Sequence, residues 1–164
     1  MPASQPFVDV FLPHLAESMR QVLAEVPDLA EQVDALWSAA RASCPEIEVP
    51  AADFLRFLAL RLDPSAFRGL PLLRVEDLYL LCAYVRGIAA AAPLFEARYL
   101  GPVTATLRRL RADPDTIEEI KQGLRHRLLL DRVLDPDHKQ YMGTGSLASW
   151  MCVWAVREVG HRRD

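Results

Sequence analysis

The chain has 164 residues, of which 51% are hydrophobic and 25% are charged, and its formal net charge is −3 at pH 7. These values are typical of a globular protein with its own buried core, and they argue against a general nucleic-acid binder. The sequence has no apolar stretch long enough to span a bilayer and no secretory signal at its amino end, so we expect a cytoplasmic protein without a membrane partner.

Helical signals run along the whole chain, and an all-α fold is predicted. Helix formers dominate, prolines stand at segment starts, and no stretch alternates apolar and polar residues over the length of a strand. The first helix is expected over residues 7–24, with a bend or restart at Pro13, and the second between Pro27 and Pro45. Pro50 begins a third helix whose apolar residues are dense enough to be largely buried. These residues are Phe54, Leu55, Phe57, Leu58, Leu60 and Leu62.

Residues 61–72 are predicted to be a linker, because they contain two prolines and a glycine. This linker divides the chain into an acidic helical extension, residues 1–70, and a second helical domain, residues 75–164. The charge is unevenly distributed along the chain: residues 1–98 hold 8 Lys/Arg and 13 Asp/Glu, whereas residues 99–164 hold 11 and 9. Such an asymmetry suggests two roles, one of which could involve a polyanion.

The second domain is predicted to begin with helices over residues 75–91 and 93–111. Asp113-Pro114 then marks the start of another helix, because the aspartate suits the N-cap and the proline suits the first helical position. The same pair at 135–136 predicts a further short turn, and the last helix is expected to begin near Ser146.

Cysteine and histidine form no recognisable site. Cys44, Cys82 and Cys152 stand tens of residues apart with no C-x-x-C pair, which favours reduced core thiols over a zinc or redox site. The histidines form no H-x-x-x-H or H-E-x-x-H pair. With no nucleophile–base arrangement and no phosphate loop either, the sequence predicts no catalytic residue, no metal and no cofactor.

The helix that follows Asp113-Pro114 is amphipathic. Its apolar residues recur at intervals of three and four, which predicts one buried face and one solvated, charged face. The residues expected to point inward are Ile117, Ile120, Leu124 and Leu128.

The turn that precedes the last helix contains two glycines. Gly143 and Gly145 allow the backbone to take positive φ or to approach another segment closely. Ser146 suits a helix N-cap, and Leu147 with Trp150 forms an inward pair at i and i+3.

Three aromatic residues flank or follow these glycines. Trp150 and Trp154 are expected to pack in the core. Tyr141 has two interpretations: it packs on the neighbouring helices, or it faces single-stranded DNA, where a base could stack on it.

The acidic, Gln-bearing helix and the turn Tyr141–Trp150, with its aromatic-Gly-x-Gly-Ser-Leu-x-x-Trp pattern, together resemble the second conserved region of bacterial RNA polymerase sigma factors of the sigma-70 family. Residues 78–100 are similar to a subfamily described from myxobacteria, whose members carry a helical amino-terminal extension. The resemblance covers residues 28–163 and implies a sigma region 2 type helical bundle.

The resemblance implies two partners. The polar face of the acidic helix would bind core RNA polymerase at the clamp helices of its largest subunit, through Glu118, Glu119, Gln122 and, on the flank, Arg125. The turn and the basic end of the last helix would bind the non-template strand of the promoter and open its −10 element. The implied DNA-binding residues are Lys139, Tyr141, Gly143, Thr144, Ser146, Arg157, His161, Arg162 and Arg163.

The chain departs from the family pattern at several positions. Gly123 stands where a glutamate is usual, and Ala148 and Ser149 are neutral where lysine or arginine is common. Family members also carry a helix-turn-helix domain that reads upstream promoter DNA, and the basic residues at the end of this sequence favour a chain that continues toward it. An anti-sigma regulator is a further candidate partner. The alternative is a sigma-like interaction module that regulates polymerase or another protein without reading DNA.

Overall fold

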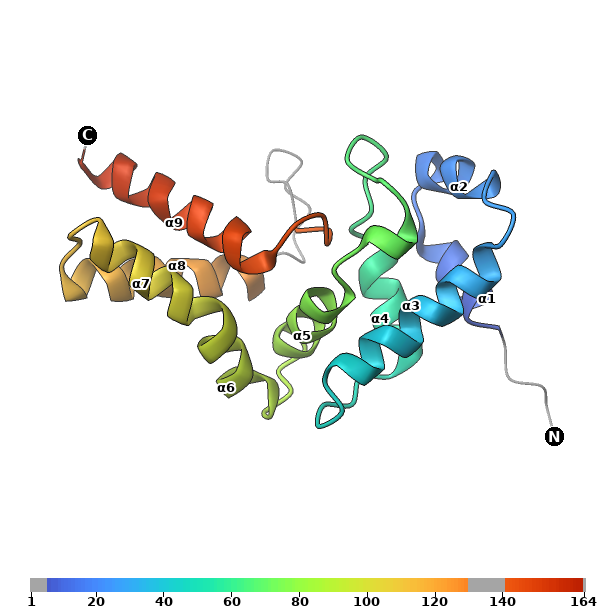
Figure 1. Ribbon diagram of the computed structural model, residues 1–164, viewed down its shortest axis with the longest axis horizontal. Helices are drawn as coiled ribbons and strands as arrows, with labels where there is room; N and C mark the ends of the chain where they lie inside the picture. The colour runs from blue at the N-terminus through green and yellow to red at the C-terminus, as the bar shows by residue number, and fades with distance from the viewer. Residues whose placement is uncertain (1–5, 130–140, 164) are drawn as a thin grey trace. The chain divides into compact units, whose positions relative to one another are not determined.

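The computed structural model describes residues 6–129 and 141–163, and within these ranges every regular element is helical, which confirms the all-α prediction (Figure 1). The chain forms two compact units. The N-terminal unit is Met1–Ala83 with Met142–Thr144, and the C-terminal unit is Tyr84–Tyr141 with Gly145–Asp164. The predicted division of the chain into an extension, residues 1–70, and a second helical domain, residues 75–164, stays a prediction.

The N-terminal unit is built from short helices. Pro13 lies in a turn of 3₁₀-helix that separates the first two, so the predicted restart is confirmed. The elements are α1 (Phe7–Phe11), η1 (Leu12–His14), α2 (Glu17–Ala24), α3 (Leu29–Ser43), α4 (Ala51–Ala59), η2 (Leu70–Leu72) and α5 (Val75–Val85), the last of which crosses into the C-terminal unit.

Tyr79 of α5 lies at the centre of the N-terminal core. Its ring packs against Trp37 of α3 and Phe54 of α4, with ring centroids 6.2 and 5.6 Å away. Its buried hydroxyl donates a hydrogen bond to the Ile47 carbonyl (2.6 Å) and accepts one from the Val49 amide (3.1 Å). A single side chain therefore ties the irregular segment between α3 and α4 to α5.

Two predicted helices end earlier than expected. The third ends at Ala59, and Leu60 just beyond it is 59% exposed, so its predicted burial is wrong. Leu60 lies four residues after the exposed Arg56, so the helical period itself places it on the exposed side of α4, opposite Leu58. Helix α5 ends at Val85 rather than near residue 91, since Gly87 takes a φ of +76°, which cannot continue a right-handed helix.

The C-terminal unit contains α6 (Ala91–Phe95), the π-helix η3 (Glu96–Leu100), α7 (Gly101–Arg109), α8 (Pro114–Leu129) and α9 (Leu147–Arg163). Helix α7 contacts both α8 and α9, which also contact each other (Figure 1). Helices α8 and α9 are antiparallel, because Glu119 pairs with Arg162 whereas Gly123 faces Trp154. Their buried rows meet in the core, and α9 contributes Leu147, Met151, Ala155 and Val159.

Both described N-cap predictions are confirmed. The Asp113 carboxylate accepts hydrogen bonds from the backbone N–H and the hydroxyl of Thr116, both at 2.9 Å. The Ser146 hydroxyl accepts a bond from the Ser149 N–H at 3.0 Å. The second Asp-Pro pair, at 135–136, lies outside the described residues. Within the described ranges, none of the helices combines the length and the hydropathy that a bilayer crossing requires.

Asp113 is expected to make the start of α8 sensitive to acid. Hydrogen bonds from the Thr116 N–H and then from its hydroxyl lower the pKa of Asp113, so its stabilising effect is complete above the ordinary aspartate pKa of about 4 and is lost as the pH falls further. Asp113→Ala should lower the melting temperature at pH 7, and the difference from wild type should shrink at acid pH. Asp113→Asn, which retains a capping oxygen, is the control and should keep most of the stability at both pH values.

Candidate functional site

Helix α8 carries the residues predicted to bind polymerase on its outer side. Ile117, Ile120, Leu124 and Leu128 are all buried, as predicted. Glu118, Glu119 and Gln122 are exposed on the other side of the helix, and Arg125 is half-buried at the edge. The separation follows from the helical period, which puts residues three and four apart on one face.

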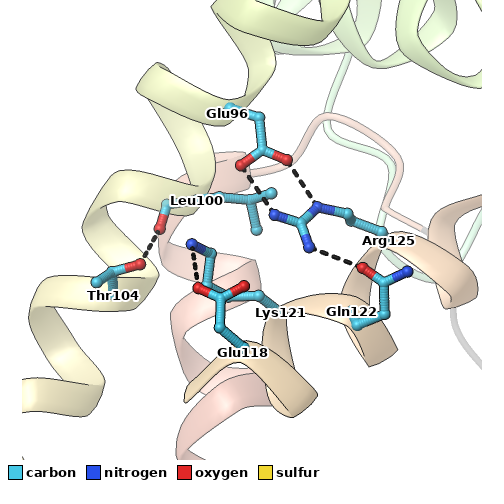
Figure 2. Close-up of polar contacts among 7 residues, drawn as sticks. All are labelled: Glu96, Leu100, Thr104, Glu118, Lys121, Gln122 and Arg125. Carbon is cyan, nitrogen blue, oxygen red and sulfur yellow. Dashed lines mark hydrogen bonds and ion pairs between the residues drawn. The ribbon is translucent and has the colours of Figure 1, made fainter. Parts of the chain in front are cut away.

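A polar network links this face to the preceding helices of the C-terminal unit (Figure 2). The Arg125 guanidinium donates to both oxygens of Glu96, with Nε 2.7 Å from Oε1 and Nη2 3.0 Å from Oε2. A third donor, Nη1, lies 2.9 Å from the Oε1 of Gln122. The bond to Glu96 raises the pKa of Arg125, which is charged at any physiological pH.

Glu96 is a site residue that sequence reasoning missed. It is 29 positions from Arg125 in the chain, and the sequence carries no local signal that would connect the two. Glu96 is the first residue of the π-helix η3, and its carboxylate points toward Arg125 of α8 (Figure 2).

The two acidic residues of the α8 face have their own partners. Glu118 pairs with Lys121 at 3.2 Å, and Glu119 pairs with Arg162 of α9 at 2.6 Å. The second pair joins a residue predicted to bind polymerase to one predicted to bind DNA. The basic end of α9 therefore lies beside the acidic face of α8.

In the C-terminal unit, Tyr141 packs against its own turn. Its side chain is 2% exposed, its hydroxyl donates to the Gly145 carbonyl at 2.6 Å, and its ring centroid is 6.2 Å from that of Trp150. Of the two interpretations of Tyr141, the packing interpretation describes this structure.

In the N-terminal unit, Gly143 makes a close contact that only glycine allows. Its φ is +88°, and its carbonyl accepts a hydrogen bond from the Arg74 N–H at 2.8 Å. A Cβ added here would lie 2.5 Å from the Cδ1 of Leu78. Gly145 has a φ of +81° but no neighbour within 4 Å of an added Cβ. The predicted positive φ is confirmed at both glycines.

The other predicted DNA-binding residues that the structure describes belong to different units. Thr144 of the N-terminal unit is exposed, as are Arg157 and His161 of α9. Arg163 donates a hydrogen bond to the Leu110 carbonyl, which lies just after α7. Lys139 lies outside the described residues.

Trp150 and Trp154 are only half-buried, so their predicted place in the core is partly wrong. The buried residues of α9 are Leu147, Met151, Ala155 and Val159. Trp150 and Trp154 each precede one of these residues by one position, so both rings lie at the edge of the contact with α8. The guanidinium of Arg127 lies 5.9 Å from the Trp150 ring and 5.6 Å from the Trp154 ring, within the range of a cation–π interaction. Gly123 faces Trp154, and an added Cβ would lie 3.5 Å from its ring, an ordinary van der Waals contact.

No metal site is present in the part of the chain that the structure describes, since no group of three or more potential His, Cys, Asp or Glu ligands occurs there. None of the three cysteines forms a disulfide. Cys44 and Cys82 are buried, whereas Cys152 is half-buried with its sulfur 3.6 Å from the Thr106 hydroxyl.

Comparisons with protein-family models, with curated proteins and with solved structures found no match to this chain.

Proposed function

We propose that this chain is a sigma-type subunit that binds core RNA polymerase through the outer face of α8 and takes part in opening promoter DNA. The observation that supports this most directly is the outward placement of Glu118, Glu119 and Gln122, opposite a fully buried apolar row. These residues have the order and spacing that the resemblance assigns to the helix that docks on the clamp helices of the largest subunit.

The electrostatics of this face suit a cationic partner. The side chains of Glu118 and Glu119 are 66% and 63% exposed, and Arg162, the partner of Glu119, is itself 42% exposed. An exposed pair such as Glu119–Arg162 contributes at most about 1 kcal/mol. An arginine or lysine of the partner can therefore take over the Glu119 carboxylate at little cost, and complementary charge would speed the encounter.

The test is a binding measurement with core polymerase. Glu119→Arg combined with Gln122→Ala is expected to weaken binding at least about tenfold, because it places a cation opposite partner cations and removes an amide. Asp34→Arg is the matched control: it reverses an exposed carboxylate on α3 of the N-terminal unit and should leave affinity unchanged.

Circular dichroism of both variants establishes that they are folded, which is expected because Glu119, Gln122 and Asp34 are all exposed. Equal capture of core polymerase by wild type and the α8 double variant would eliminate this docking face.

A second candidate is an interaction module that binds polymerase or a regulator without reading DNA. Its support is the burial of Tyr141 and the engagement of Arg162 and Arg163 within the C-terminal unit. Permanganate reactivity of promoter thymines separates the two candidates. A holoenzyme assembled with this chain melts the promoter in the first case and leaves it double-stranded in the second.

A further inference from the structure

The amide of Gln122 has a defined orientation. Arginine carries only hydrogen-bond donors, so the Gln122 atom that lies 2.9 Å from the Arg125 Nη1 must be the amide oxygen. The amide nitrogen is then turned away from Arg125, as Figure 2 shows. Since Gln122 is exposed, α8 presents two N–H donors to whatever approaches this face.

Arg125 in turn is held by Glu96. Two parallel N–H···O bonds fix the plane of the guanidinium as well as its position. The two side chains are 21% and 39% exposed, so the pair is better shielded from water than the Glu118 and Glu119 carboxylates. The third donor of Arg125 is thereby aimed at Gln122.

The position of Glu96 comes from an uncommon backbone element. The N–H of Gly101 bonds to the carbonyl of Glu96, five residues earlier, which is the π-helical pattern. At the other end of η3 the Thr104 hydroxyl donates to the Leu100 carbonyl at 3.1 Å. Single π turns inside helical segments are frequent at functional sites.

We propose that Glu96 is a positioning residue that acts through Arg125 and fixes the orientation of the Gln122 amide. In this orientation α8 presents the two N–H donors of Gln122. The partner must therefore offer a hydrogen-bond acceptor opposite them. That acceptor is a carboxylate or a main-chain carbonyl, flanked by the cations that Glu118 and Glu119 attract. This inference rests on the proposed docking role of α8 and adds the chemistry of the partner surface.

A double-mutant cycle on core polymerase affinity tests the relay. Glu96→Ala and Gln122→Ala should each weaken binding about fivefold to tenfold, since each removes the oriented donor. In the Gln122→Ala background, Glu96→Ala should have almost no further effect. Independent, multiplying losses would show that Glu96 acts only on general stability and would overturn the relay.

A charge swap tests the predicted orientation. In the double variant Glu96→Arg with Arg125→Glu the ion pair is retained, but residue 125 then only accepts hydrogen bonds, so the Gln122 amide must reverse. Binding should be at least as weak as in Gln122→Ala, because the swap also reverses the charge of residue 125 on the proposed docking face. Full recovery of polymerase binding by the swap would overturn the proposed orientation.

A measurement on the free protein separates failure of this inference from failure of the proposed function. The side-chain ¹⁵N signal of Gln122 should report a rigid amide in wild type and a mobile one in Glu96→Ala. Gln32, whose amide nitrogen donates to Asp28 at 3.1 Å in the N-terminal unit, is the internal control and should not change. Wild type that fails to bind polymerase overturns the docking role and the partner chemistry, whereas an unchanged Gln122 signal overturns the positioning by Glu96.

Discussion

Gly143→Ala is expected to destabilise the protein by about 2–5 kcal/mol, whereas Gly145→Ala should cost only about 1–2 kcal/mol. Both glycines have positive φ, so an alanine at either position carries the penalty of the left-handed region. Only at Gly143 does the new Cβ also collide, at 2.5 Å from the Leu78 Cδ1 and 3.2 Å from its Cγ.

The collision cannot be relieved easily. Leu78 is fully buried in α5, and the Gly143 carbonyl is held by the Arg74 N–H. Either the leucine must leave its rotamer or the backbone must move, and forced repacking of this kind typically costs about 1–3 kcal/mol.

Urea unfolding followed by circular dichroism measures both free energies. In a cycle with Leu78→Ala, the losses at positions 143 and 78 should be less than additive, because the shortened side chain removes the clash. Similar losses at the two glycines, or strict additivity with Leu78→Ala, would contradict the close contact. Any loss of activity in a Gly143 variant must be corrected for this destabilisation before it is assigned to DNA binding.

Tyr79→Phe is the second change with a large expected effect, a loss of about 2–4 kcal/mol. The phenylalanine ring keeps the contacts with Trp37 and Phe54, so the effect isolates the hydroxyl. Without it, the Ile47 carbonyl loses a donor and the Val49 N–H loses an acceptor inside the core. Each buried polar group left unpaired costs about 1–3 kcal/mol. Burial also raises the pKa of Tyr79, which keeps the hydroxyl a donor at neutral pH.

Tyr141→Phe is the matched control for Tyr79→Phe. The Tyr141 hydroxyl also donates to a carbonyl at 2.6 Å, but that carbonyl belongs to the exposed residue Gly145, and water can replace the lost donor. We expect a loss of about 0.5–1.5 kcal/mol, the net value of an ordinary hydrogen bond. Denaturant titrations of the two variants with equal losses would argue against a special role of the Tyr79 hydroxyl.

Much of the local structure of this protein was determined by the sequence itself. Asp113 and Ser146 cap helices as predicted, because an N-cap depends only on residues within one helical turn. Gly143 and Gly145 take positive φ for an equally local reason. The buried row from Ile117 to Leu128 follows from the period of a single helix, and with it the outward direction of the predicted polymerase-binding face.

The extent of each helix was less predictable than its existence. The sequence predicted one helix over residues 93–111, and the backbone is helical from Ala91 to Arg109, but a π turn that was not predicted lies between α6 and α7. The stretch contains Gly101-Pro102, and Pro102, which has no N–H to donate and is disfavoured inside a helix, stands in the first turn of α7 directly after the π turn. The burial of Leu60 was mispredicted from the density of apolar residues, whereas its spacing places it on the exposed face of α4, four residues after Arg56.

The partners of the candidate site were decided only by the tertiary structure. Arg162 and Glu119 are 43 residues apart, and Arg125 and Glu96 are 29 apart, so each pair exists only because helices from distant parts of the chain pack side by side. The same packing leaves Trp150 and Trp154 at the edge of the α8–α9 contact, although their sequence spacing is equally compatible with the core. Apolar residues that recur every three or four positions indicate which face of a helix is buried, but a single charged or aromatic residue gives no such indication of the residue that it contacts. Which residue it meets depends on how the buried rows of two helices align, and that alignment is a property of the assembled core.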